Sequence, residues 1–154
     1  MSAMSNIEGA SAVTEQRVFV DTNVLVYAYD LSAGEKHERA REIVEELWRT
    51  RTGCISVQVL QEFFVNVTRK IPKPLSTAQT KEIVSDLGHW KMHSPSARDV
   101  VEAIDLHERL SLSFWDGMIL RSAASLGCTV LYTEDLNAGQ SYDGIRTKNP
   151  FSTP

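Results

Sequence analysis

Short apolar runs alternate with longer amphipathic stretches along this sequence. The runs are rich in β-branched residues and cover residues 17–21, 53–56 and 129–132. Between them, apolar residues recur every three or four positions, which is the spacing of a helix with one buried face. This alternation predicts parallel strands joined by helices. We therefore expect an α/β fold, a three-layer sandwich with a mainly parallel sheet flanked by helices.

Several residues mark where the helices begin and end. Ser76 with Gln79, and Ser96 with Asp99, have the spacing of capping boxes. Gly127 suits the left-handed residue that follows a helix. We expect helices over residues 23–29, 36–48, 57–70, 97–109 and 113–126, a further helix opened by Ser76, weaker strands at 91–93 and 144–147, and a loop over 133–143.

The length and composition fit one folded domain. The 154 residues carry 20 acids and 16 bases, and the net charge of −4 neither indicates nor excludes a nucleic-acid partner. Residues 1–16 are small and polar, so we expect a disordered tail before one domain over 17–151. No apolar run is long enough to cross a bilayer, and we expect a cytoplasmic protein without membrane contact.

Four acidic residues are predicted to meet where the strands end. Asp21 ends the first apolar run, and Asp135 comes just after the last one. Glu62 lies in the first two turns of a helix that follows a strand, and Asp116 lies in the first turn of a helix that precedes one. Both helices begin at the carboxyl edge of the sheet, because they run antiparallel to the strands.

Each of these acids also has an ordinary structural interpretation. Asp21 could cap a helix, and Glu62 could be a surface residue. Asp116 could pair with the helix cap Ser113, and Asp135 could belong to a turn. Four carboxylates in one place repel one another, however, so a fold that gathers them without bases needs a cation. Oxygen ligands with room for water and phosphate favour Mg²⁺ or Mn²⁺, which support phosphodiester hydrolysis without histidine.

Histidine and cysteine are not expected to add metal ligands. Cys54 and Cys128 have no second Cys or His at metal-ligand spacing. A disulfide between them is one interpretation, and two buried thiols in a reducing cytosol is the one we favour. The histidines are expected at the surface of outer helices: His37, His89, His93 and His107.

Four short segments carry the acids: VFVDTNVLVY around Asp21, QEF around Glu62, FWDGMIL around Asp116 and LYTED around Asp135. Together they resemble the PIN domain and, more narrowly, the toxin nucleases of the VapC type from bacterial toxin–antitoxin pairs. The resemblance covers about residues 17–151. Asp-Thr-Asn after an apolar strand is fairly specific, and the ordered set of four segments is strong.

The resemblance implies an endoribonuclease that uses Mg²⁺ or Mn²⁺ to cut single-stranded or loop RNA. The catalytic and metal-binding acids would be Asp21, Glu62, Asp116 and Asp135, the first and third being the most direct ligands. Three neighbours would orient carboxylates or water: Asn23, Ser56 and Thr133. The family also implies an antitoxin that inserts a segment into the active-site groove, and a homodimer.

Two features depart from the family pattern. Glu134 lies beside Asp135, so either could supply the fourth carboxylate. The only compact basic cluster is Arg69, Lys70 and Lys73, so we expect weak, salt-sensitive RNA affinity.

Other functions remain to be weighed. A phosphorelay receiver needs an acidic pair after its first strand, and a haloacid-dehalogenase-type phosphatase needs a second Asp two residues after its nucleophile. Thr22 and Asn23 follow Asp21 and argue against both. A PIN-fold scaffold that binds RNA or proteins without catalysis stays open, as does an RNA-processing nuclease without an antitoxin.

Overall fold

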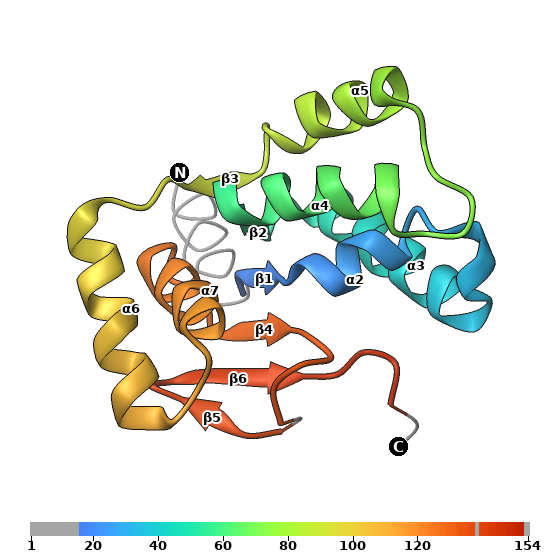
Figure 1. Cartoon of the computed structure of the whole chain (residues 1–154). Helices are drawn as coiled ribbons and strands as arrows, with labels where there is room; N and C mark the ends of the chain where they lie inside the picture. The colour runs from blue at the N-terminus through green and yellow to red at the C-terminus, as the bar shows by residue number, and fades with distance from the viewer. Residues whose placement is uncertain (1–15, 138, 153–154) are drawn as a thin grey trace, which may run out of the picture.

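A six-stranded sheet in the order β3-β2-β1-β4-β6-β5 forms the centre of the structure (Figure 1). The structure is a computed structural model, and it describes residues 16–137 and 139–152. Every neighbouring pair of strands is parallel except β5 with β6. The strands are β1 (Val18–Val20), β2 (Gly53–Ser56), β3 (Lys91–His93), β4 (Val130–Tyr132), β5 (Ser141–Tyr142) and β6 (Ile145–Lys148).

The helices form two groups. α2, α3, α4 and α5 pack on one another, and α6 packs on α7 (Figure 1). α3 and α4 from the first group and α7 from the second all contact β2, so the mainly parallel sheet is flanked by helices, as the predicted α/β sandwich requires. The helices are α2 (Thr22–Tyr27), α3 (Glu35–Thr50), α4 (Val57–Arg69), α5 (Thr77–Leu87), α6 (Ala97–Leu110) and α7 (Phe114–Ser125), with a 3₁₀ turn η1 at Leu31–Ala33.

The middle of the sheet is buried on both faces. All residues of β1 and β2 are buried, as expected for parallel strands between two helix layers. Cys54 and Cys128 are buried free thiols, as predicted. Within the described residues, no helix is both long and apolar enough to pass through a membrane.

Two expectations, for the loop over 133–143 and for His93, are corrected by the structure, and a third, for the N-terminal tail, stays untested. The predicted loop over 133–143 contains a two-residue strand, β5, which pairs antiparallel with β6. His93 is not a surface residue of a helix: it lies in β3 with its side chain 11% exposed, 3.2 Å from Asp99 and 2.8 Å from Ser122. The edge strand is only partly buried, and His93 is covered there because α6 and α7 supply these two partners. The predicted tail, apart from Gln16, lies outside the described residues.

Candidate active site

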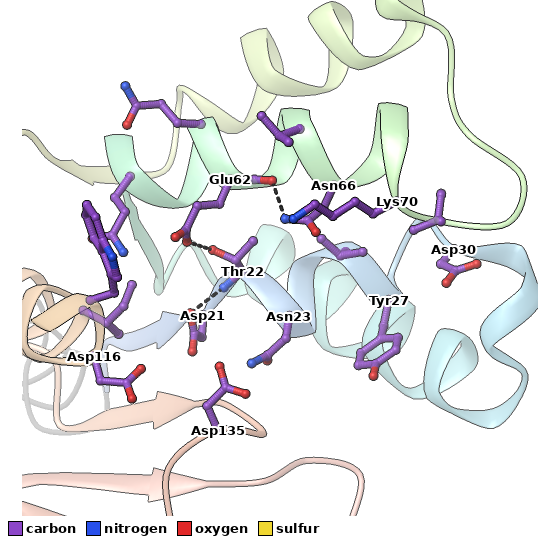
Figure 2. Close-up of a pocket in the computed structure, with 17 residues that line it drawn as sticks. Asp21, Thr22, Asn23, Tyr27, Asp30, Glu62, Asn66, Lys70, Asp116 and Asp135 are labelled. Atoms are coloured by element: carbon purple, nitrogen blue, oxygen red, sulfur yellow. Dashed lines mark hydrogen bonds between the residues drawn. The ribbon is translucent and has the colours of Figure 1, made fainter. Parts of the chain in front are cut away.

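A cleft of about 680 Å³ brings the four predicted acids together. Asp21 follows β1, Asp135 follows β4, Glu62 lies on α4, and Asp116 lies in the first turn of α7. Figure 2 shows the side chains of Asp21, Asp116 and Asp135 turned toward one shared space, with Glu62 on the other side of Thr22. The carboxyl ends of the strands and the starts of the following helices therefore build this site, as the topology predicts.

Asp21 is held from two directions. Its Oδ1 accepts a hydrogen bond from the backbone N–H of Thr22 at 2.7 Å, so the residue also caps α2. Its Oδ2 accepts from the hydroxyl of Thr133 at 2.7 Å. Asp21 is 5% exposed and Thr133 is fully buried. The two bonds fix the direction of the carboxylate in the cleft. The bond from Thr133 is the contact that its predicted orienting role requires.

Glu62 is positioned by residues that the sequence analysis did not single out. The hydroxyl of Thr22 donates to Glu62 Oε1 at 2.7 Å. The side-chain amide of Asn66 donates to the backbone carbonyl of Glu62 at 2.7 Å, also within the cleft. The sequence could have indicated Asn66, because it lies four residues after Glu62 and residues four apart on a helix share one face. The contact of Thr22 depends on packing of α2 against α4, which the sequence does not reveal.

The two acids that follow β4 point to different places. Asp135 lines the cleft. Glu134 is 2.5 Å from Lys36 and accepts a hydrogen bond from the hydroxyl of Tyr27 at 2.9 Å. The side chain of Asn23 accepts from the backbone N–H of Glu134 at 3.3 Å, which anchors the loop that carries Asp135. Of the two candidates, Asp135 is therefore the one placed with the other acids.

Asp116 is placed by the close approach of α7 to α6. Ser113 caps α7 and accepts from the backbone N–H of Asp116 at 3.1 Å. The next residue, Gly117, has no room for a side chain, because a Cβ there would lie 2.7 Å from the backbone carbonyl oxygen of Ala103. Gly117 thus sets the depth of α7 and, with it, the position of the adjacent carboxylate.

The charges of the acids act on one another. The pKa of Asp21 is raised to about 7, mainly by burial and also by the negative charges of Asp135 and Asp116, although the hydrogen bonds from Thr133 and Thr22 lower it. Burial also raises the pKa of Asp116, with added repulsion from Asp135 and Glu62. Among the described residues, neither Asp21 nor Asp116 forms an ion pair with a lysine or arginine. The cleft therefore carries repulsion that a bound cation would relieve.

Lys70 and Ser56, a basic residue of the predicted cluster and a predicted orienting residue, are placed differently from the four acids. Lys70 is the one lysine or arginine among the described residues that line the cleft, and Figure 2 shows its side chain beside Asn66, away from Asp116 and Asp135. Ser56 is fully buried and caps α4 by accepting from the backbone N–H of Val59 at 3.3 Å. The described residues give Ser56 no hydrogen bond to any of the four acids.

The separation of the acids limits how an ion could be held. Within the described ranges, no three His, Cys, Asp or Glu side chains lie close enough to hold a metal ion by themselves. The acids line one cleft, but among the described residues no three of them are close enough to coordinate a single ion together. Such a donor set fits an ion that keeps several waters and takes only one or two carboxylates directly, which is the usual habit of Mg²⁺.

Comparison with known proteins agrees with this architecture. The sequence matches the PIN domain family over residues 18–140. The chain belongs to the PIN domain family. No curated protein sequence matches this PIN domain.

Several solved structures with a similar fold come from toxin–antitoxin pairs. A toxin–antitoxin complex from Klebsiella pneumoniae matches with a TM-score of 0.64 at 19% identity, over 88% of this chain and 99% of that one. DNA-bound VapBC from Salmonella typhimurium matches with 0.61 at 18%, over 88% and 98%. Mycobacterium tuberculosis VapC20, described as a toxin that cleaves the sarcin–ricin loop, matches with 0.57 at 17%, over 77% and 89%. At these identities the likeness establishes that the PIN domain has the fold of VapC toxins.

Proposed function

We propose that this PIN domain is a Mg²⁺- or Mn²⁺-dependent endoribonuclease that acts in the cytoplasm as the toxin of a toxin–antitoxin pair. One observation carries the proposal: Asp21, Glu62, Asp116 and Asp135 line a single cleft in which Lys70 is the one base among the described lining residues. Membership of the PIN domain family and likeness to a toxin described as cleaving the sarcin–ricin loop support RNA as the substrate.

The chemistry of the donors supports a hard divalent ion. The four acids offer only carboxylate oxygens, which suit Mg²⁺ or Mn²⁺ better than softer metals. Asp21 and Asp116 are the proposed direct ligands, because burial first and the neighbouring acids second raise the pKa of each, and a bound cation would favour the ionised form of both carboxyl groups. When bound, the ion would activate a water and neutralise charge that develops on the phosphodiester.

The protein's own residues would keep this arrangement in place. Thr133 and the backbone of Thr22 would hold the two oxygens of Asp21 in fixed directions. The hydroxyl of Thr22 would hold Glu62 in the same way. Asn23 would keep Asp135 at the rim by anchoring the loop through Glu134. Such preorganisation lowers the barrier because the carboxylates need not reorient when the substrate arrives.

A cleavage assay with mapped fragment ends tests the proposal. Purified protein, freed of any partner, should cut total RNA with Mg²⁺ or Mn²⁺ and should stop when EDTA is added. Asp116→Asn should lower the rate at least about a hundredfold while the melting temperature is kept, because a neutral amide cannot balance the charge of the ion.

A matched substitution separates the cleft from the rest of the surface. Asp86 is an exposed aspartate on α5 that does not line the cleft, so Asp86→Asn should cut RNA at the wild-type rate. Full activity of Asp116→Asn, or activity that survives EDTA, would contradict the metal assignment. An intact fold that cuts no RNA under any condition would favour the non-catalytic scaffold.

The proposed toxin role has its own test in cells. Expression of the wild-type chain alone should arrest growth, and Asp21→Asn should remove the arrest. Co-expression of a small protein encoded beside it should restore growth if that protein is its antitoxin. Cleavage of RNA without any growth arrest would instead favour an RNA-processing nuclease. We also expect a homodimer, which sedimentation of the purified chain measures directly.

A further inference from the structure

Asp135 differs from the other three acids of the cleft in how it is held. Asp21 and Glu62 accept hydrogen bonds on their carboxylates, and Asp116 is carried by the first turn of a helix. Asp135 lies in the loop after β4, and among the described residues its carboxylate accepts no hydrogen bond. Its backbone N–H donates to the hydroxyl of Thr133 at 3.0 Å. The position of Asp135 therefore depends on how the loop around it is fixed.

The residue beside it, Glu134, is fixed by both of its carboxylate oxygens. Oε1 accepts from the hydroxyl of Tyr27 at 2.9 Å, and Oε2 accepts from Nζ of Lys36 at 2.5 Å. Glu134 does not line the cleft, so these two partners hold its side chain outside the site. Neighbouring Cα atoms are joined at a fixed distance, so a restraint on Glu134 also restrains Asp135.

The chain after β6 packs against both partners of Glu134. The rings of Phe151 and Tyr27 meet edge-on with centroids 5.1 Å apart. Nζ of Lys36 lies 5.0 Å from the Tyr27 ring and 5.7 Å from the Phe151 ring, within the range of cation–π attraction. Nε of Arg39 on α3 donates to the backbone carbonyl of Pro150 at 3.4 Å. These contacts hold Lys36 and Tyr27 in the directions in which they meet Glu134.

We propose that Tyr27, Lys36 and Phe151 form a clamp on Glu134 that positions Asp135 for the metal ion; this inference rests on the proposed ribonuclease function. The three are positioning residues, because they act on the site only through Glu134. A partly exposed ion pair contributes little to overall stability. Its loss can still cost much function, because groups that support a metal ligand set the direction in which that ligand points.

Binding of Mn²⁺ without RNA tests the clamp apart from cleavage. Mn²⁺ is titrated into each protein and followed by electron paramagnetic resonance. Lys36→Met and Tyr27→Phe should each raise the dissociation constant about three- to tenfold, and Lys36→Arg should retain most of the affinity. The direction is decisive, because loss of a nearby positive charge would by itself strengthen the binding of a cation.

A double-mutant cycle shows whether the effect passes through Glu134. With Glu134→Ala in place, adding Lys36→Met or Tyr27→Phe should weaken Mn²⁺ binding no further, because the carboxylate that they hold is gone. Phe151→Ala should weaken binding in the wild-type background and have no effect in the Glu134→Ala background, whereas Phe151→Tyr keeps the ring and should behave as the wild type.

Two matched substitutions remove the same groups elsewhere. Tyr29 packs edge-on against Phe63, and its hydroxyl has no hydrogen bond to any described residue. Lys81 is exposed on α5. Neither Tyr29 nor Lys81 lines the cleft, so Tyr29→Phe and Lys81→Met should bind Mn²⁺ as tightly as the wild type.

The outcomes also separate this inference from the proposed function. Mn²⁺ affinity in Lys36→Met that equals or exceeds that of the wild type, or effects that add to those of Glu134→Ala, would overturn the clamp. If such a protein still cuts RNA, the ribonuclease proposal stands. The expected pattern in a chain whose wild-type form never cuts RNA would support the clamp and refute the ribonuclease. A wild type that binds no Mn²⁺ would refute the proposed metal site and the clamp with it.

Discussion

Asp21 combines burial with negative charge, and its surroundings only partly relieve the conflict. Two hydrogen bonds favour its ionised form, but burial and the nearby acids outweigh them and bring its pKa to about 7 from the usual 3.8. The folded protein therefore keeps a proton on Asp21 between these two pH values, where the unfolded chain has released it. Stability contributed by this residue is present at low pH and is lost as the pH rises toward 7.

The pH dependence of unfolding should reveal this single carboxyl group. In EDTA, the free energy of unfolding of the wild type relative to Asp21→Asn should fall by about 3 kcal/mol between pH 5 and pH 8. Over that window the folded protein loses the proton on Asp21, whereas the unfolded chain has already lost it. Urea denaturation at the two pH values measures it. Asp99 provides the control: Ser96 and Arg121 hold its pKa below the usual range, so the stability difference between wild type and Asp99→Asn should not change over the same window. A constant difference for Asp21→Asn would contradict its raised pKa.

Single residues also mark how far the sequence could predict the site. The placement of Asp21 and Asp135 follows from strand ends, which apolar runs define locally. The choice between Asp135 and Glu134 could not be made from strand ends. It depends on Lys36, which lies 98 positions away from Glu134 in the chain and pairs with it.

Among the elements, local signals predicted most boundaries. Both capping boxes are present at α5 and α6, and Gly127 has the left-handed φ of 71° expected after α7. β5 could not be predicted, because a strand of two residues is too short to show an alternation of apolar and polar residues. It is defined only by its pairing with β6. The partial burial of His93 could not be predicted for a related reason: its partners lie on α6 and α7, and their packing against β3 is a tertiary contact.

The contact between α6 and α7 should be the most sensitive junction for activity. Gly117→Ala introduces a Cβ 2.7 Å from the carbonyl oxygen of Ala103, which forces the helices apart. Overpacking of this kind costs about 1–3 kcal/mol and outweighs the better helix propensity of alanine, which is about 1 kcal/mol. We expect a lower free energy of unfolding and a loss of RNA cleavage larger than the unfolded fraction explains, because Asp116 moves with α7.

A substitution on the exposed side of the same helix is the matched comparison. Ser125 lies in the last turn of α7 and is exposed, so Ser125→Ala should leave both unfolding and cleavage unchanged. Denaturation curves and cleavage rates are measured on all three proteins. Wild-type stability in Gly117→Ala would mean that α6 and α7 can separate freely, and the proposed control of Asp116 by packing would fail.

For the whole molecule, charge sets the conditions for meeting RNA. The chain carries a net charge of −4, and five of its acidic residues line the proposed substrate site. Most nucleic-acid-binding proteins attract the phosphate backbone with a basic surface. Here Lys70 is the one base among the described cleft residues, so phosphate and cleft repel each other until a cation intervenes.

RNA affinity should therefore rise when Mg²⁺ is added, although added salt normally weakens such binding. With Asp116 intact and a non-cleavable RNA analogue whose bridging phosphodiester oxygens are replaced by methylene groups, replacing EDTA by Mg²⁺ should tighten binding about tenfold or more, because each bound ion removes two charges of repulsion. Sodium chloride at the same ionic strength should raise the affinity far less, because it screens the repulsion without binding between the acids and the phosphates. Lys70→Ala should weaken binding with and without Mg²⁺ by a similar factor, since that residue lies farther along the cleft. Equal affinity in EDTA and Mg²⁺ would show that the acids do not face the phosphates, and it would remove the electrostatic basis of the proposed site.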